Sequence, residues 1–379
     1  MKRSATLILA CLLAATAPRA QEQIKSIITN ERDSAYYQEQ TRLWRQVVDQ
    51  EPQNENAWLN LYQAANYMRW YIPEDSTAKQ VLSDMEQAIP QSYNYFWCRY
   101  KESAGGEEAN TYAEEALKRL PAQPSFTDYD MWTSYLAMRF DERRLSDLCK
   151  RYYQSGLYSP TVLQYNYNEL QGMEEGGIYI GNGDAVLIPK YILQYGKKVH
   201  QDKLVICMSF LAIPEYRQHV LSRLGIDTNL DQYERPQSQE DYDRNERELI
   251  NLIITHTKRP VYFSPLNQQK RNQPWEKNLY NEGLTLHYSP TKYDNFSVKL
   301  RNVEERYLME YLLVQFTPDQ WTASNRLSAN YSVMMADVLE YYKKHDVKRY
   351  KWLMNLLVSG IEHTSLTQDE KNKFLNLLR

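Results

Sequence analysis

The sequence predicts an α + α/β protein, in which an α-solenoid of paired helices precedes a small doubly wound, mostly parallel sheet with flanking and C-terminal helices. Apolar residues recur at helical spacing from about residue 24 to residue 173. The segment Gly176–Pro214 then reads as strand, Gly-Asn-Gly-Asp turn, helix and strand, which is the pattern of a parallel βαβ unit. Strand and helix patterns continue to alternate until about residue 290, and only helical patterns follow.

The first 20 residues have the pattern of a secretory signal peptide. Basic residues precede the apolar run Ala5–Ala15, and the small residue Ala20 stands before a cleavage point at Gln21. This predicts an exported protein, with the periplasm as the favoured location. Cys11 offers an alternative, because Leu-Ala-Cys resembles a lipid-attachment box. We favour ordinary cleavage, because the apolar run continues beyond Cys11.

Composition excludes some classes of function. The full chain has a formal net charge of −3 with mixed signs, so it lacks the basic footprint of a nucleic-acid-binding protein. No segment after the signal reaches the length of about 20 apolar residues that a membrane span requires. The other cysteines lie far apart in apolar contexts, and the histidines lack metal-ligand spacing. We therefore predict no disulfide, metal or cofactor, and buried thiols at Cys98, Cys149 and Cys207.

Residues 21–173 are predicted to form the helical repeats. Pro52, Pro90 and Pro121 each close a helix. Apolar residues stand five and eight positions before these prolines, and large aromatic residues follow the first two: Trp44, Val47, Leu82, Met85, Ala113, Ala116, Trp58 and Phe96. This pattern resembles tetratricopeptide repeats. The resemblance implies stacked helix pairs with a concave groove for protein partners; the alternative is that the array only braces the second domain.

Residues 174–300 are predicted to form the α/β domain. Its four predicted strands are Ile178–Gly181, Leu204–Ser209, Pro260–Ser264 and Leu284–Tyr288. Its predicted helices are Ala185–Tyr195, Pro214–Leu224 and Glu240–His256, with a flexible connection at Asp231–Asp243 and a loop at Asn267–Tyr280 containing a short helix from Pro274. In the helical region 301–379 we predict helices at Val303–Val314, Ser328–His345, Val347–Glu362 and Gln368–Leu378.

The turn after the first strand is the main candidate site. Ligands of open α/β sheets bind at the carboxyl ends of the strands, near a helix N-terminus. This places Gly181, Asn182, Gly183 and Asp184 where a ligand is expected, with Asp184 either capping the next helix or binding a cation or a sugar hydroxyl. The other polar residues expected at this edge are Ser209, Ser264, Glu282 and His287, of which we retain Glu282 and His287 as ligand-binding candidates. No catalytic residue and no metal ligand is assigned.

Three segments of this domain resemble a known family. They are Ile-Gly-Asn-Gly-Asp at 180–184 with Tyr-Ile-Leu-Gln at 191–194, Arg-Pro-Val-Tyr-Phe-Ser at 259–264, and Asn-Glu-Gly-Leu-Thr-Leu-His-Tyr-Ser-Pro at 281–290. Their order is similar to the C-terminal part of a bacterial family of multi-pass membrane proteins of unknown function, described as protein-O-mannosyltransferase-like. Ala185 and Val186 stand where that family has its second acid, His287 stands in place of an arginine, and no segment corresponds to the membrane-embedded portion. The resemblance implies a relative retained for binding.

These patterns favour an exported, non-enzymatic scaffold or accessory protein of bacterial envelope machinery, which binds protein partners through the repeat groove. The machinery could serve glycan assembly, transport or secretion. One alternative is a carbohydrate- or phosphate-handling enzyme that uses Asp184 with Asn182, and Glu282 or His287. Another is a glycan-binding module that presents Trp275 and Trp321 as exposed aromatic platforms.

Overall fold

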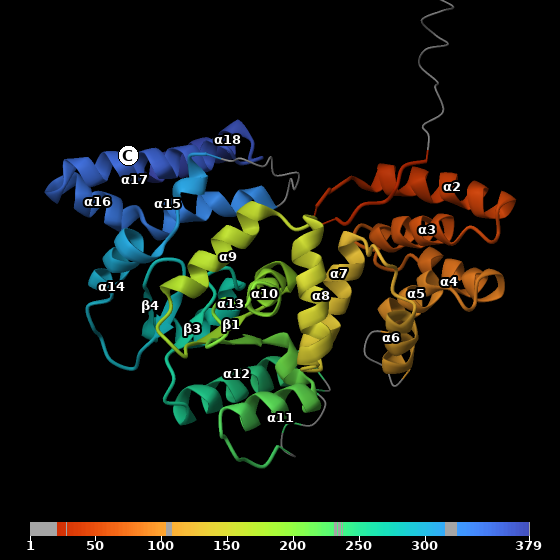
Figure 1. Ribbon diagram of the computed structural model, residues 1–379, viewed down its shortest axis with the longest axis horizontal. Coiled ribbons are helices and arrows are strands. Elements are labelled where there is room, and N and C mark those ends of the chain that lie inside the picture. Colours follow the sequence, from red (N-terminus) through yellow and green to blue (C-terminus); the bar gives the residue numbers. More distant parts are fainter. Residues whose placement is uncertain are drawn as a thin grey trace, which may run out of the picture. The chain divides into compact units, whose positions relative to one another are not determined.

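The computed structural model of the protein describes residues 21–27, 29–103, 108–230, 233, 236, 238–314 and 324–378 (Figure 1). The predicted signal peptide, with Cys11, and the tryptophan at position 321 lie outside these residues. The chain has an α + α/β fold, and its contacts divide it into two compact units, residues 1–123 and residues 124–379.

The first unit consists of helices that pack against their neighbours along the chain. Asp33 and Asn54 cap the first two helices by accepting hydrogen bonds from backbone N–H groups. The predicted apolar stripes are largely buried, with Met85, Ala113 and Ala116 fully inaccessible. Every helix in this unit that was expected to end before a proline does so. The helices are α2 (Ser34–Gln50), α3 (Glu55–Met68), α4 (Thr77–Ala88), α5 (Tyr93–Ser103) and α6 (Ala109–Lys118).

The second unit begins earlier than the predicted domain boundary. The helices α7 (Phe126–Met138), α8 (Glu142–Ser155) and α9 (Pro160–Gly172) follow the helical pattern, but they pack on the α/β elements. Leu145, Leu148 and Cys149 form the buried stripe of α8, which contacts the π-helical segment η2 (Ile192–Gly196). The boundary therefore falls at 123/124 instead of 173/174, because periodicity identifies the buried face of a helix but not the partner that covers it.

The sheet formed by the described residues has five strands in the order β2-β1-β3-β5-β4. Three strands are parallel: β1 (Ile178–Gly181), β2 (Leu204–Cys207) and β3 (Val261–Phe263). The connections from β1 to β2 and from β2 to β3 contain α10 (Asp184–Tyr191) with η2, and then η3 (Ser209–Ala212), α11 (Pro214–Arg223) and α12 (Gln239–His256). These elements agree with the predicted strands and helices to within a few residues.

The last part of the sheet differs from the prediction. The strand predicted at Leu284–Tyr288 is β5 (Leu286–Tyr288), and it runs antiparallel to β3. Its other neighbour is an unpredicted strand, β4 (Leu279–Asn281), at the end of the segment that we predicted to be a loop. The rest of that segment holds α13 (Gln269–Asn272) and the 3₁₀ helix η5 (Gln273–Asn278). The sheet is therefore mixed and not mostly parallel, because β5 runs antiparallel to β3 and pairs with β4 through a tight turn.

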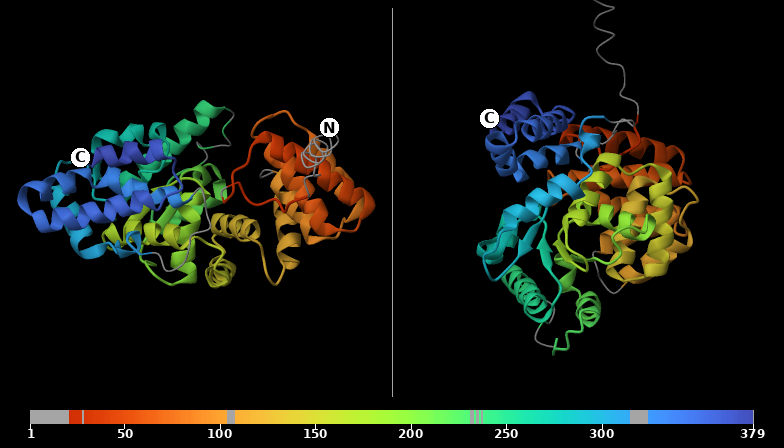
Figure 2. Two further views of the ribbon diagram at one scale, coloured as in Figure 1. Left: turned by 90° about the horizontal axis from the view of Figure 1, so that it is seen from above. Right: turned by 60° about the vertical axis from the view of Figure 1, so that its left-hand side comes forward.

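The two faces of the sheet are covered by different helices (Figures 1 and 2). Phe263 points to the side of α12, where its ring lies 5.0 Å from that of Trp275. Tyr179 points to the opposite side and meets Lys190 of α10 and Glu169 of α9. Tyr179, Tyr262 and His287 are paired in register on neighbouring strands. Residues paired in this way point to the same face of a sheet, so all three lie on the face covered by α9 and α10.

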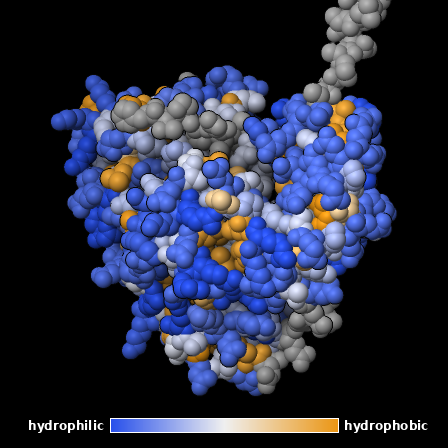
Figure 3. Space-filling view, turned by 45° about the vertical axis from the view of Figure 1, so that its right-hand side comes forward, coloured by the Kyte–Doolittle hydropathy of each residue, from blue (hydrophilic) through white to orange (hydrophobic). Residues whose placement is uncertain are grey.

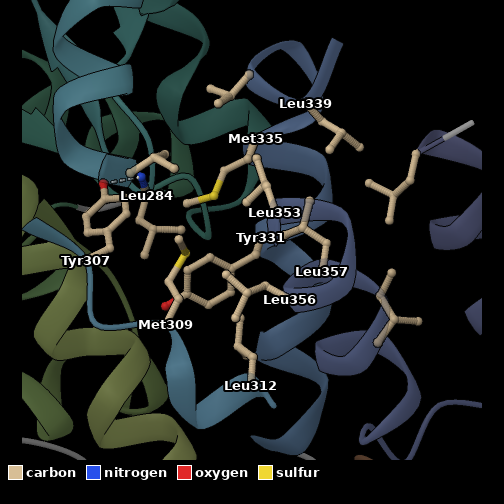
Figure 4. Close-up of a cluster of buried hydrophobic side chains, with 14 of the residues drawn as sticks. Leu284, Tyr307, Met309, Leu312, Tyr331, Met335, Leu339, Leu353, Leu356 and Leu357 are labelled. Carbon is tan, nitrogen blue, oxygen red and sulfur yellow. Dashed lines mark hydrogen bonds between the residues drawn. The ribbon is translucent and has the colours of Figure 1, made fainter. Parts of the chain in front are cut away.

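The C-terminal helices enclose an apolar core (Figure 4). Leu353, Leu356 and Leu357 of α17 pack with Tyr331, Met335 and Leu312, all buried. The elements are α14 (Asn295–Arg301), η6 (Asn302–Arg306), η7 (Glu310–Leu312), η8 (Ser324–Ala329), α15 (Asn330–Met334), α16 (Ala336–His345), α17 (Val347–Glu362) and α18 (Gln368–Leu377).

Two of the C-terminal helices predicted to be continuous are interrupted. The helix expected at Val303–Val314 ends at Tyr307, whose backbone is extended. The Tyr307 side chain turns back to the β4–β5 hairpin, where its hydroxyl accepts a hydrogen bond from the Leu284 N–H at 2.9 Å. The helix expected at Ser328–His345 is broken at Met335, a buried residue between α15 and α16.

Cys98, Cys149 and Cys207 are buried, as predicted. Burial raises the pKa of Cys149 and of Cys207 to about 12, so both thiols stay protonated at neutral pH. Within the described ranges, no helix combines the length and apolar character needed to cross a bilayer. The face shown in Figure 3 is mostly hydrophilic, with hydrophobic residues in small groups.

A partly buried histidine in the loop before β2, His200, leads us to predict that the stability of the protein depends on pH. The His200 Nε2 atom is buried without a hydrogen-bond partner among the described residues. Burial, with help from the Lys203 charge and against that of Asp202, lowers the pKa of His200 from 6.5 to about 4. As pH falls below 6.5 the unfolded chain binds this proton first, so the free energy of unfolding falls progressively until the folded state is also protonated near pH 4.

We expect this histidine to account for about 2 kcal/mol of unfolding free energy lost between pH 7 and pH 4. His200→Asn should lose correspondingly less, because asparagine does not titrate and tolerates the positive φ of 54° at this position. Urea unfolding at several pH values would measure the difference. Equal pH dependence in the two proteins would contradict this assignment.

Candidate ligand-binding site at the carboxyl ends of β1, β2 and β3

The predicted glycine turn joins β1 to α10. Gly183 has a φ of 89°, a backbone conformation that favours glycine, and it is the N-cap residue of α10. Asn182 precedes it, and its Oδ1 accepts a hydrogen bond from the Ser209 N–H at 3.1 Å and a second from the Ser209 hydroxyl. This amide therefore ties the end of β1 to the residue that follows β2, so two predicted edge residues are in contact.

Asp184 does not cap α10, and that part of the prediction is wrong. It is the first residue of the helix, and its side chain makes no capping hydrogen bond. Its Oδ1 instead accepts a hydrogen bond from the Ser134 hydroxyl of α7 at 2.9 Å. The carboxylate is thus held by the neighbouring helix, whereas Asn182 is held by the end of β2.

A partly buried charge pair completes the polar cluster at this edge of the sheet. Arg271 of α13 donates from one guanidinium nitrogen to Glu246 of α12 at 3.0 Å and to the Ser209 hydroxyl at 3.2 Å. The Arg271 and Glu246 side chains are only 17% and 9% exposed. Burial raises the pKa of Glu246, while the Arg271 charge opposes this shift. We call Asn182, Ser209, Glu246 and Arg271 the strand-end cluster.

Polar groups also line the sheet next to this cluster. The Ser264 N–H donates to the Ile180 carbonyl at 3.0 Å, which extends the pairing of β1 with β3. The Asn267 side chain donates to the same carbonyl at 3.3 Å and to Asn272 at 3.1 Å. Its Oδ1 acceptor is buried and has no partner among the described residues. A buried acceptor without a hydrogen bond is uncommon in native proteins, so the Asn267 Oδ1 atom could accept a hydrogen bond from a bound molecule.

Glu282 and His287 come together in space, but in the β4–β5 hairpin and not at the strand-end cluster. Glu282 is 2% exposed, and its Oε1 lies 3.0 Å from His287 Nδ1 and also accepts from the Tyr293 hydroxyl. The His287 ring stacks on that of Tyr262 at 4.7 Å. Among the described residues, no hydrogen bond joins this pair directly to Asn182 or Asp184, so the six predicted ligand-binding residues fall into separate groups.

A third polar group was not predicted at all. Lys190 and Glu169 are both completely buried, with Nζ and Oε2 2.6 Å apart. Nζ also donates to Asn166 Oδ1 at 2.5 Å and to the Val186 carbonyl at 3.0 Å, and the Tyr179 hydroxyl donates to Glu169 at 3.0 Å. The one available sequence signal was Lys190 itself, a single charge within the apolar run Val186–Leu193.

Arg271 and Glu246 were missed for a different reason. Arg271 lies in the polar segment that we predicted to be a loop, and Glu246 is one of several acids on α12. Trp275, a predicted exposed platform, is 6% exposed and donates from Nε1 to Asn251 at 2.7 Å, so that prediction is wrong. In the described ranges, no group of three or more His, Cys, Asp or Glu side chains could hold a metal ion.

Comparisons with family models, with curated proteins and with solved structures each find no match to this chain. Fold and geometry alone therefore define its class, which is an α + α/β protein with a partly buried polar cluster at the carboxyl ends of its parallel strands. The cluster combines a fixed guanidinium group with amide and hydroxyl groups. Such a set can bind an oxyanion, because guanidinium nitrogens match the geometry of carboxylate and phosphate oxygens.

Proposed function

We propose that this chain is a binding protein whose C-terminal unit holds a small oxyanion, a carboxylate or a phosphate, at the strand-end cluster. The observation that supports this most directly is the position of Arg271. One of its nitrogens is engaged by Glu246 and Ser209, which fixes the plane of the guanidinium group. Its remaining donors are the groups that a ligand would use. Asn182 accepts bonds through Oδ1 and so keeps its amide hydrogens as further donors.

The location supports the same proposal. In the order β2-β1-β3, the chain leaves β1 toward β2 and then crosses to the other side of β1 to form β3. Ligands of open α/β sheets bind outside the strand ends at such a reversal of strand order. Asn182 follows β1, Ser209 follows β2, and Arg271 follows β3, so the cluster draws one group from beyond each strand.

Inorganic phosphate and acetate are suitable probes, titrated calorimetrically into the purified full-length protein. We expect Arg271→Met to weaken binding at least tenfold, because charge-assisted hydrogen bonds contribute about 1.5–3 kcal/mol. Glu246→Gln should instead strengthen binding, because it removes a carboxylate that competes for the guanidinium group. Arg244→Met is the matched control. Arg244 lies on α12, the helix that carries Glu246, and it pairs with Asp241 at the surface. Unchanged binding in Arg271→Met would exclude this site.

The N-terminal unit supports a second function, that of an exported, non-enzymatic scaffold or accessory protein of the envelope. We propose that its helix pairs form a tetratricopeptide-like solenoid that binds a protein partner. The supporting observation is an apolar patch after α3, where Trp70, Tyr71 and Ile72 are 70%, 42% and 48% exposed. Contiguous exposed apolar residues mark interaction sites, and tryptophan and tyrosine are enriched in interfaces.

We expect replacement of Trp70 and Ile72 by serine to abolish recovery of a stoichiometric partner in affinity capture from the native envelope. Both side chains are exposed, so the folded state should be retained. Val347→Ser is the control, because Val347 is 62% exposed in the C-terminal unit. Mass photometry of the captured material would measure stoichiometry, and a wild-type protein recovered only as a clean monomer would refute the scaffold function.

A further inference from the structure

A cavity of about 180 Å³ lies beside the edge strand β2, away from the strand-end cluster. Its walls come from several parts of the C-terminal unit: the end of α7 and the start of α8, the end of α10 with η2, the loop before β2 with β2 itself, and α11. The strand order leaves one side of β2 without a neighbouring strand. The residues that carry the argument are Phe140, Glu142, Gln194, Tyr195, Gln201 and Arg223.

Packing and hydrogen bonding fix the aromatic walls of this cavity. Phe140, at a positive φ of 51°, stacks on His219 at 3.9 Å and on Tyr216 at 5.0 Å. The Tyr216 hydroxyl accepts a hydrogen bond from the Cys207 N–H of β2 at 3.0 Å. This fixed wall of rings, with Leu204 and Val205 of the edge strand also in the lining, suits a ring-shaped ligand.

The charged lining is neutralised. Arg223 and Glu142 form an ion pair between α11 and α8, with side chains 40% and 46% exposed. Lys203 is paired with Asp202 at 3.0 Å. An ionic ligand would have to compete with these pairs, at the cost of leaving one partner without its counter-charge. The lining therefore favours a neutral ligand.

The polar lining supplies both donors and acceptors. Gln194 uses its amide nitrogen to donate to the carbonyls of His200 and Lys203, at 2.7 and 2.8 Å, so the group that it can still offer is the acceptor Oε1. Glu142 adds acceptors, Arg223 adds donors, and Gln201 and Tyr195 add both. A purely apolar ligand would displace water from these groups without replacing its hydrogen bonds, whereas hydroxyl groups can both donate and accept.

Size and chemistry together identify a class of ligand. A cavity of roughly 150 Å³ accommodates a benzene ring, so this larger one can hold a six-membered ring with substituents. We propose that the cavity is a second binding site, which takes a neutral pyranose sugar with its apolar ring faces against the aromatic and aliphatic walls and its hydroxyl groups toward the Arg223–Glu142 pair.

The test uses the full-length protein and saturation-transfer NMR with four probes: methyl β-glucopyranoside, methyl β-galactopyranoside, glucuronate and cyclohexylmethanol. We expect at least one neutral glycoside to bind, with a dissociation constant on the order of 1 mM, as suits a ligand of this size. Glucuronate and cyclohexylmethanol should bind at least tenfold more weakly. Failure of both glycosides to bind, or equal binding of the anionic or apolar ring, would overturn the proposal.

Two variants place the binding in this cavity. Tyr195→Phe keeps the ring and removes the hydroxyl, and Gln201→Ala changes an exposed side chain, so neither threatens the fold. Each should weaken glycoside binding about three- to tenfold, the effect of one lost hydrogen bond. Tyr153→Phe on α8 is the control, because Tyr153 is exposed and does not line the cavity. Arg271→Met should leave glycoside binding unchanged, which separates this site from the strand-end cluster. Binding that neither Tyr195→Phe nor Gln201→Ala weakens would refute the assignment to this cavity.

Discussion

Replacing Lys190 by methionine is expected to destabilise the protein by about 3–5 kcal/mol. Lys190 and Glu169 are both 0% exposed, and their charged atoms are 2.6 Å apart. Burial lowers the pKa of Lys190 and raises that of Glu169, and each partner opposes the shift of the other. Without the ammonium group, Glu169 would have to be ionised alone in the core or become protonated. Either state is unfavourable, so the cost reflects the group left behind.

The double variant Lys190→Met, Glu169→Leu provides the decisive comparison. It removes both charges and fills similar volume, and buried pairs replaced in this way often cost little or even stabilise a protein. We expect it to recover most of the stability lost in the single variant. It should remain about 1–2 kcal/mol less stable than the wild type, because Asn166 and Tyr179 each lose a hydrogen-bond partner.

An exposed ion pair serves as the matched control. Lys344 pairs with Glu340 one turn away on α16, with side chains 63% and 67% exposed. Lys344→Met should leave the free energy of unfolding nearly unchanged, because water screens the pair. Urea unfolding followed by circular dichroism would measure all three variants. A cost for Lys190→Met no larger than that of the control would contradict the prediction.

The second large effect is expected at Gly283, in the hairpin turn between β4 and β5. Its φ is +122°, a backbone region that residues with a side chain rarely adopt. A Cβ atom here would overlap the Tyr307 hydroxyl, which also lies within 2.7 Å of where a Cβ atom on Gly172 would stand. Tyr307 is thus held between the end of α9 and the hairpin, and it cannot move away without breaking its hydrogen bond with the Leu284 N–H (Figure 4).

We expect Gly283→Ala to cost on the order of 3–5 kcal/mol, because backbone strain and overpacking add. Gly176→Ala is the control for strain alone, since Gly176 has a φ of +69° with open space around it; about 1–2 kcal/mol is expected there. Thermal unfolding would rank the two variants. The prediction fails if Gly283→Ala is no more destabilised than Gly176→Ala.

Local pattern was sufficient to predict β1, α10 and α17. In these segments an apolar run or stripe is bounded by clear signals, such as the glycines that flank Ile178–Ile180 or Asp346 capping the start of α17. It was insufficient for β4, because Leu279–Asn281 is short and partly polar. That strand exists because β5 lies beside it, and its register depends on the turn at Gly283.

Part of the candidate site could also be predicted from local sequence pattern, and part could not. The Gly-Asn-Gly turn is recognisable from the residues themselves, and its contact with the end of β2 follows from the βαβ pattern. Arg271 joins Ser209 across 62 positions of the chain, and Lys190 joins Glu169 between two helices. Neither pairing produces a periodic pattern in the sequence. A single polar residue on a helix or in a loop looks the same in the sequence whether water or a distant side chain forms its hydrogen bonds.

By itself, the sequence determined that helical patterns come first, that a βαβ unit begins at residue 178, and that a glycine-containing turn ends its first strand. Tertiary packing decided the rest: that α7–α9 belong to the second unit, that the last strands form a hairpin, and that the buried charges find partners. The physical reason is one of range. Backbone preference and amphipathic period act over a few neighbouring residues, whereas the burial of a charge or the covering of a helix face depends on residues far away along the chain.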